Sequence, residues 1–168
     1  MSPFEIRQKI NTRYCGEVDV VYREADPLEN LDGKLLTGVH AFCFCGDKLV
    51  IVYAENKKYW TPPGGGIEPG ETYEQAVVRE VAEETNMRVL HQELIGYQDC
   101  YEPTRIVRQV RSFCVVEPIG DFVVDPDGDI TEIKLIDSID YEKYVKWPGP
   151  ITDRLLERVL ELKKKYTK

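Results

Sequence analysis

Long apolar runs, paired cysteine motifs and an excess of basic residues are all absent from this sequence of 168 residues. No apolar run is long enough to span a bilayer, and the first residues lack the apolar stretch of a secretion signal, so we expect a cytoplasmic protein with no membrane partner. The 22 basic and 30 acidic residues give a formal charge of −8. This balance argues against binding to a nucleic-acid backbone, which favours a basic surface.

The sequence is also poor in metal-binding soft ligands. Its five cysteines include no C-x-x-C pair, and its two histidines, His40 and His91, are isolated. This leaves no ligand set for zinc, and a lone histidine is more often structural than catalytic. The odd number of cysteines and a reducing compartment favour free thiols that pack as small hydrophobic side chains.

What the chain contains is enough for one domain with a core, since 42% of its residues are hydrophobic and 31% charged. We expect a short amphipathic helix over residues 3–14, with a strand at 18–22 and a loop at 25–33. The β-rich runs 35–45 and 49–54 predict a hairpin, and the Pro- and Gly-rich segment 60–66 predicts irregular structure. Further strands are expected over 87–101, 106–116 and 132–136, with a turn at 126–129.

Two helices complete the prediction, one in the middle of the chain and one at its end. Thr72 and Gln75 fit a capping box, and Asn86 suits the left-handed residue that ends a helix. A helical turn over 137–144 precedes a helix over 152–165, whose apolar stripe is Leu155, Leu156, Val159, Leu160 and Leu162. We therefore predict an α/β fold in which a sheet lies between helices.

The most informative segment is residues 65–87, GGIEPGETYEQAVVREVAEETNM. At about 100° per residue, Glu80, Glu83 and Glu84 fall within an arc of about 100° on one helix face. The opposite face, predicted to pack on the sheet, carries Val78, Val81, Ala82 and Thr85.

Three like charges at one spot repel each other, and a bound Mg²⁺ or Mn²⁺ would turn that repulsion into ligation. Mg²⁺ also takes phosphate oxygens as ligands, so the pattern predicts a substrate with a pyrophosphate. The glycines at 64–66 let phosphate and metal approach the backbone. Glu71, just before the helix, is within reach of Arg79, which we expect to orient the acidic groups. The plain alternative is an exposed Arg79–Glu83 pair, but that alternative leaves the glycine-rich turn unexplained.

The pattern Gly65-x5-Glu71-x7-Arg79-Glu80-Val81-x-Glu83-Glu84-x-Asn86-Met87 closely resembles the Nudix box. It departs once, at Asn86, where the box has glycine, and Asn tolerates the left-handed conformation. The resemblance implies a Nudix-type α/β/α sandwich with a mixed β-sheet core. It divides the chain into an N-terminal extension (1–33; short helix, strand and loop) and a Nudix hydrolase domain (34–168).

The resemblance further implies a MutT-like nucleotide pyrophosphohydrolase. Such an enzyme uses Mg²⁺, or Mn²⁺ in its place, to hydrolyse a nucleoside diphosphate linked to another moiety. By resemblance the metal ligands are Glu80, Glu83, Glu84 and the Gly65 carbonyl, and the catalytic set is Glu80, Glu83, Arg79 and Glu71. The general base stays open among Glu80, Glu83 and the later carboxylates Glu117, Asp129 and Glu132.

The substrate is expected to be a small-molecule nucleotide. Trp60 and Tyr101 could stack on a base, although both are equally suited to packing. Arg111 is the candidate for a phosphate contact. Pro103 lies near the position where family members acting on ADP-ribose often carry proline.

Two alternative functions were weighed, and the role of one segment stays undetermined. A nucleotide-sensing module that does not cleave would usually lose box carboxylates, and all are present here. An isomerase of the isopentenyl-diphosphate type needs a cysteine and a glutamate across a pocket, and no motif supports Cys43 or Cys45 in that role. Residues 1–33 could add an edge strand or complete a homodimer.

Overall fold

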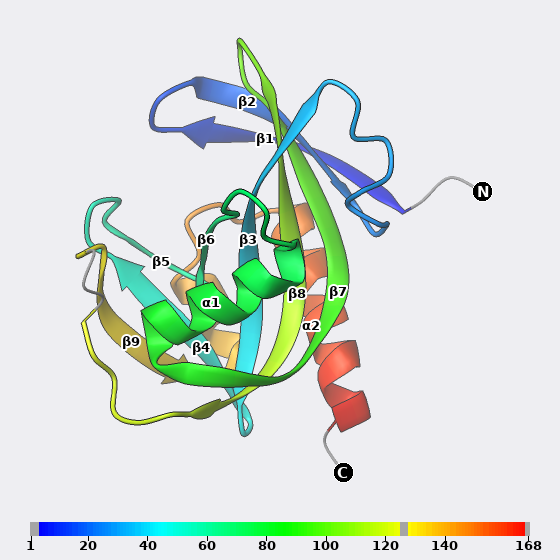
Figure 1. Cartoon of the computed structure of the whole chain (residues 1–168). Helices are drawn as coiled ribbons and strands as arrows, with labels where there is room; N and C mark the ends of the chain where they lie inside the picture. Colours follow the sequence, from blue (N-terminus) through cyan, green and yellow to red (C-terminus); the bar gives the residue numbers. More distant parts are fainter. Residues whose placement is uncertain (1–3, 125–127, 167–168) are drawn as a thin grey trace.

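The computed structural model describes residues 4–124 and 128–166. Within them, one sheet of nine strands lies between two helices, α1 (Tyr73–Thr85) in front and α2 (Pro150–Tyr166) behind (Figure 1). The strands are β1 (Glu5–Thr12), β2 (Gly16–Arg23), β3 (Lys34–Cys45), β4 (Lys48–Ala54), β5 (Tyr59–Thr61), β6 (Gly64–Gly66), β7 (Met87–Tyr101), β8 (Ile106–Pro118) and β9 (Ile130–Ile136). A 3₁₀ helix, Ser138–Lys143, precedes α2. Neither α-helix is both long and apolar enough to cross a membrane.

The sheet is mixed, as predicted. Its strand order is β1-β2-β7-β8-β3-β4-β5, with β6 paired to β3 and β9 paired to β4. The β3–β8 pair is parallel and the other pairs are antiparallel. The long central strands β3, β7 and β8 thus form a platform, and the short strand β6 carries the glycine-rich turn along one edge of β3.

Strand β3 faces both layers because successive side chains of a strand point to opposite sides. Val39, Ala41 and Cys43 pack in the cluster that includes α1. Phe42 and Phe44 pack on the other face in the cluster that includes α2. The α/β/α sandwich predicted from the sequence is therefore confirmed.

Helix α1 begins and ends where the sequence predicts. The Thr72 side chain accepts from the Gln75 backbone N–H, and the Gln75 side chain accepts in turn from the Thr72 backbone N–H. Asn86 ends the helix in the left-handed conformation, with φ 54°. The Asn86 side chain also donates to the Asp121 carbonyl at 2.8 Å, a contact that a glycine would lack.

The buried face of α1 differs from the prediction. Ala76, Val77, Val81, Glu84 and Thr85 are buried, whereas Val78 is 45% exposed and Ala82 is only half-buried. The buried arc is rotated by about 90° from the predicted one, at about 100° per residue. This rotation places Ala76 and Val77 in the cluster that packs on the sheet and carries Glu84 inward.

The helix predicted over residues 3–14 is wrong, because this segment forms strand β1, which pairs antiparallel with β2. Its apolar points Phe4, Ile6 and Ile10 are all at even positions and so fit a period of two as well as a helical one. The burial pattern of β1 alternates strictly. Pairing with β2 decided between the two periods, and residues 4–33 contain two strands and a loop.

The segment 60–66 is also more regular than predicted. Strand β5 pairs with β4, and β6 pairs with β3. The pairing of β6 depends on glycine, because a Cβ at Gly64 would lie 2.1 Å from the Val39 carbonyl oxygen. In α2, Leu155, Val159 and Leu162 are buried as expected, but Leu160 is 39% exposed.

The remaining predicted strands, the 35–54 hairpin, the loop at 25–33 and the helical turn before α2 are confirmed. The turn predicted at 126–129 falls partly outside the described residues. Within the described part, β9 begins at Ile130, two residues earlier than predicted.

Candidate functional site

The glycine-rich turn and α1 meet along the β6 edge of β3. A Cβ at Gly65 would lie 2.5 Å from Oε1 of Glu80, so the Glu80 carboxylate rests directly against the Gly65 backbone. One turn further along α1, Glu84 is 7% exposed and accepts a hydrogen bond from the Gly64 backbone N–H at 2.7 Å. Two of the predicted metal ligands are thus held against the turn by its lack of side chains.

Arg79 lies at the centre of this arrangement. Its Nε and Nη2 donate to both oxygens of Glu71, at 2.8 and 2.9 Å. Its Nη1 donates to Glu80 at 2.8 Å and to Glu83 at 3.3 Å, and Nη2 also donates to the Gly66 carbonyl at 2.8 Å. We call these residues (Glu71, Arg79, Glu80 and Glu83) the fork. One guanidinium therefore fixes three carboxylates and the turn.

The electrostatics of the fork follow from that geometry. The hydrogen bonds from Arg79 and from the Glu68 backbone N–H lower the pKa of Glu71 to about 2. The same bond to Glu71 raises the pKa of Arg79 above its ordinary value. Both groups therefore stay charged throughout the neutral range, and Glu71 acts as an acceptor, not as a proton donor.

The oxygens of the turn and helix suit a hard cation in type, since carboxylate and carbonyl oxygens are the donors that Mg²⁺ and Mn²⁺ prefer. In the described part of the chain, however, no three His, Cys, Asp or Glu side chains are close enough together to hold an ion. The physical reason is visible in the fork, where Arg79 lies between Glu71, Glu80 and the 44% exposed side chain of Glu83.

A groove of about 430 Å³ opens on the opposite face of the sheet, beside α2. His40 and Arg111 form part of its floor, and Tyr59, Lys57, Lys146 and Trp147 are among its walls. In the strand register, His40 on β3 lies opposite Arg111 on β8 and opposite Gly64 on β6. The groove floor and the glycine-rich turn are therefore connected through one row of residues across three strands.

Arg111 has an unusual environment for a buried guanidinium. It is 9% exposed and donates to Nδ1 of His40 at 3.1 Å and to Oε1 of Gln109 at 3.1 Å. No carboxylate forms an ion pair with it in residues 4–124 or 128–166. Burial lowers the pKa of Arg111 to about 10, and burial together with Arg111 lowers the pKa of His40 well below its ordinary value.

Arg108, three residues earlier on the other face of β8, shows the usual solution. It is fully buried and pairs with both oxygens of Asp99, at 2.8 and 3.1 Å. It also donates to the carbonyls of Pro27 and Glu29, which anchors the loop after β2. Arg108 is therefore a structural residue. Asp99 balances the charge of Arg108, whereas no carboxylate of the described residues balances the charge of Arg111.

The structure does not bring together the three residues predicted to bind substrate. Arg111 lines the groove, but Trp60 does not, although its strand neighbours Tyr59 and Thr61 do. The Trp60 ring packs instead on Tyr53 and Tyr144, with centroids 5.2 and 5.9 Å away.

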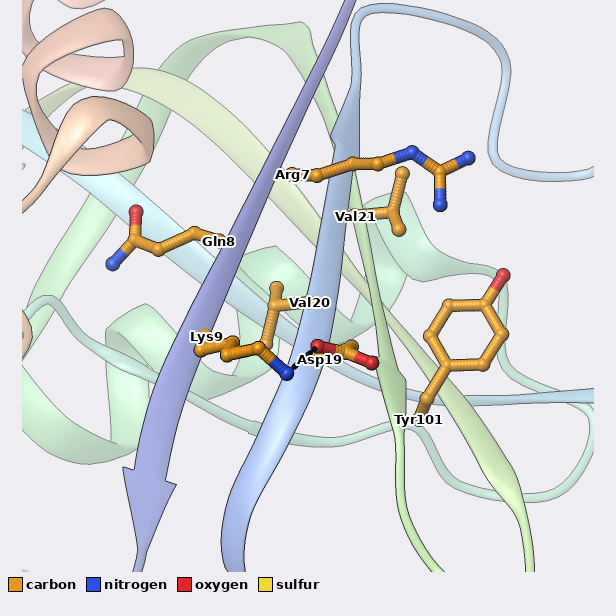
Figure 2. A pocket seen from close by; sticks show the side chains of 7 residues that line it. All are labelled: Arg7, Gln8, Lys9, Asp19, Val20, Val21 and Tyr101. Carbon is orange, nitrogen blue, oxygen red and sulfur yellow. Dashed lines mark hydrogen bonds and ion pairs between the residues drawn. The ribbon is translucent and has the colours of Figure 1, made fainter.

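Tyr101 lies elsewhere, because it points to the opposite side of β7 from Cys100, which lines the groove. Figure 2 shows Tyr101 in a second pocket, on the same side of the strands as Arg7 and Val21 and beside Asp19. Base stacking by Trp60 or Tyr101 thus finds no support in their positions.

Several groove residues were missed from the sequence. The alternation of β3 places His40 on the same face as Phe42, but only the register of β3 with β8 sets it beside Arg111. Lys57, Lys146 and Trp147 come from connecting segments that no motif marks.

The other candidates are also placed. Glu117 pairs with Arg88 at 2.9 Å, Glu132 is exposed on β9, and the buried Oδ1 of Asp129 has no hydrogen-bond partner among the described residues. All five cysteines are free thiols, as predicted. Cys43 is fully buried, and Cys45 packs in the same cluster beneath α1. Neither cysteine therefore lines the groove.

Comparison with known proteins finds relatives in both sequence and structure. A segment of 44 residues, 26% of this chain, is 43% identical to the asymmetrical bis(5′-nucleosyl)-tetraphosphatase of Caenorhabditis elegans and covers 30% of that protein. The chain therefore matches less than a third of that relative's own length.

Among solved structures, the pyrophosphohydrolase BsRppH of Bacillus subtilis superposes with a TM-score of 0.70 at 20% identity, over 92% of this chain and 96% of that one. A MutT structure from work on Aliivibrio salmonicida and Vibrio cholerae gives 0.57 at 20% identity, over 74% and 98%. At these identities the structural likeness supports the fold alone. The family model of the NUDIX domain matches residues 34–155, most of the chain, and with the box residues gathered at one turn, the chain belongs to the NUDIX family.

Proposed function

We propose that this protein hydrolyses a phosphoanhydride bond in a nucleoside diphosphate linked to another moiety. The observation that carries the proposal is the fork, in which Arg79 joins Glu71, Glu80, Glu83 and the Gly66 carbonyl into one unit. An exposed helix would gain tenths of a kcal/mol from such pairs and would have no use for the glycine-rich turn. The tetraphosphatase and pyrophosphohydrolase names of similar proteins agree with this reaction class.

Divalent metal is part of the proposal. The ion would be Mg²⁺ or Mn²⁺, since both prefer oxygen ligands. Its ligands would be the carboxylates of Glu80, Glu83 and Glu84 and the carbonyl oxygen of Gly65. When bound, the ion would neutralise developing phosphate charge and lower the pKa of water.

The residues of the chain have separate tasks around it. Arg79 holds the side chains of Glu80 and Glu83 beside the glycine-rich turn. The glycines of β6 let the diphosphate approach the backbone, and Glu84 fixes the turn through the Gly64 N–H. The proton released by the attacking water passes to a carboxylate, for which Glu80 and Glu83 are the candidates at the turn.

The decisive variant is Glu83→Gln, which removes a charge and preserves shape. We expect Mg²⁺-dependent release of a nucleoside monophosphate to fall at least about a thousandfold, measured across nucleotide sugars, dinucleotides, nucleoside triphosphates and ADP-ribose. Glu74→Gln, an exposed position on the first turn of α1, is the matched control and should retain full activity. Titration with Mn²⁺, followed by electron paramagnetic resonance, should show weaker ion binding in the first variant only.

Two results would contradict the proposal. Near-normal turnover by Glu83→Gln would remove the metal assignment. Nucleotide binding by the wild type without turnover under any divalent cation would indicate a sensing module instead. The cytoplasmic location and a possible homodimer stay predictions.

A further inference from the structure

Strand β9 forms an edge of the sheet that no other described strand covers. It pairs with residues 49–54 of β4 along one side only, and Figure 1 shows it at the margin of the sheet, away from β1. Apart from this pairing, no backbone–backbone hydrogen bond within residues 4–124 and 128–166 involves residues 130–136. The outer N–H and C=O groups of β9 therefore have no backbone partner among the described residues, and such an edge pairs readily with another strand.

The opposite edge of the sheet, β1, is covered by the chain itself. Nε1 of Trp147 donates to the backbone carbonyl of Asn11 at 3.1 Å. The side chain of Gln8 accepts from the Ile151 backbone N–H at 3.1 Å, at the start of α2, and Gln8 and Ile10 form a wall of the groove. The two edges thus differ, and β9 is the one that is open to a partner strand.

The sequence of β9, ITEIKLI, is self-complementary when two copies run antiparallel. The outward backbone groups of a strand belong to alternate residues, so a twofold axis between two copies must pass through a residue. An axis at Ile133 sets each Glu132 opposite Lys134 of the second copy and gives two oppositely charged pairs. An axis at Glu132 or at Lys134 instead sets two like charges opposite each other, which is destabilising. Charge therefore selects one register.

The two charged side chains of β9 are not used within the chain. Glu132 and Lys134 are exposed, and neither forms an ion pair or a side-chain hydrogen bond with any other residue that the structure describes. Lys134 lies over the rings of Trp60 and Tyr144, at 5.2 and 5.5 Å, which places its side chain on the α2 face of the sheet. Glu132 projects on the same face, because side chains two positions apart in a strand share a face.

Aliphatic side chains add to the same contact. The register with its axis at Ile133 sets the two Ile133 side chains opposite each other and Leu135 opposite Thr131 of the second copy. Leu135 is 44% exposed, and Ile139, three residues beyond the end of β9, is 87% exposed. Exposed aliphatic side chains at an open strand edge suit contact with another protein surface.

We propose that the protein forms a homodimer in which β9 of two copies pairs antiparallel about a twofold axis at Ile133. The two sheets then join into one continuous sheet across the axis. Seven residues from each copy form an interface smaller than that of most stable complexes, so we expect a dissociation constant of about 1–100 µM. This dimer needs neither metal nor substrate and is therefore independent of the proposed hydrolysis.

Sedimentation velocity of the whole chain in low salt, from about 1 to about 500 µM, measures the dimer. Glu132→Lys and Lys134→Glu each set like charges opposite one another, so each should weaken the dimer about tenfold or more. The double variant, Glu132→Lys with Lys134→Glu, restores opposite charges and should dimerise like the wild type. An equimolar mixture of the two single variants should also form a dimer, because one copy then carries two lysines and the other two glutamates.

Lys9→Glu on β1 is the matched control, because it changes the net charge as Lys134→Glu does and breaks an exposed pair with Asp19. It should leave the dimer unchanged. Hydrogen exchange at high and low protein concentration locates the interface, and protection should increase with concentration in residues 130–136.

Three results would overturn the proposal. The first is a wild type that stays monomeric across this range of concentration, and the second is a pair of single variants that dimerise as the wild type does. The third is protection that rises in residues 5–12 instead, which would place the interface on β1. Urea denaturation shows whether each single variant is folded, and recovery of the dimer in the double variant and in the mixture separates the effect of charge from a loss of folding.

Discussion

At the fork three glutamates share one arginine, whereas in the groove four cations share no carboxylate among the described residues. The two regions lie on opposite sides of β3 and meet at Gly64 and His40. In the fork the protein supplies both signs of charge, which fixes side chains before any ligand arrives. In the groove, the cations that line it form no ion pair with the described residues.

The difference teaches how each region is stabilised. Charge-assisted hydrogen bonds to Arg79 offset the repulsion among its glutamates. Arg111 has only neutral acceptors, and burial lowers its pKa to about 10, which reflects the cost of holding its charge there. Removing the Arg79 charge should therefore leave the three glutamates of the fork without their shared partner.

The largest effect is expected from Arg79→Met. It leaves Glu71, Glu80 and Glu83 without their shared partner, so hydrolysis should fall about a hundredfold or more and the free energy of unfolding by about 1–3 kcal/mol. Activity assays and urea denaturation measure the two quantities. Arg88→Met removes an exposed pair with Glu117 and should shift the free energy of unfolding by less than about 1 kcal/mol. If the two variants lost the same activity and the same free energy of unfolding, the fork would be no different from an ordinary exposed ion pair.

Gly65→Ala adds a single methyl group and tests whether the Glu80 carboxylate must rest against the Gly65 backbone. The new Cβ would lie 2.5 Å from Oε1 of Glu80, so the carboxylate must move, and a displacement of about 1 Å can cost about a hundredfold in rate. Glutamate is flexible, so the loss of stability should stay modest. At the neighbouring Gly66 a Cβ would meet only the Thr37 carbonyl at 3.8 Å, and Gly66→Ala should keep most activity. A fully active Gly65→Ala would show that Glu80 need not contact the turn.

The fork could be predicted from the sequence because its residues are local. Glu71, Arg79, Glu80 and Glu83 lie within 13 positions, and helical spacing alone brings the last three together. The capping box and Asn86 set the ends of α1 for the same reason. The rotation of α1 could not be predicted, since it depends on how Ala76 and Val77 fit against the sheet.

The groove could not be predicted because it depends on register and long-range contacts. Arg111 meets His40 only through the parallel pairing of β8 with β3, 71 residues apart. The wall from β1 requires that residues 5–12 form a strand, and their apolar positions fitted both periods. Trp147 reaches Asn11 across 136 residues, a contact that no local pattern encodes.

The smallest predicted effect tests the charge of the groove through His40. Arg111 donates to Nδ1 of His40, so that nitrogen must be unprotonated, and a proton there would face the guanidinium. Burial, and after it the Arg111 guanidinium, hold the pKa of His40 well below its ordinary 6.5 in the folded state. Below about pH 6.5 the unfolded chain takes up a proton that the folded chain refuses, so the free energy of unfolding falls as pH decreases.

We expect a loss of about 1 kcal/mol between pH 6.5 and pH 5.5, at up to about 1.4 kcal/mol per pH unit for one group. His40→Gln should flatten this slope, because glutamine keeps an acceptor for Arg111 and does not titrate. Urea denaturation at half-unit steps of pH measures the wild type and the variant. The opposite result is a wild type whose free energy of unfolding shows no pH dependence that His40 accounts for. Arg111 would then not carry an uncompensated charge, and the groove would resemble the fork in having its charge balanced by the protein itself.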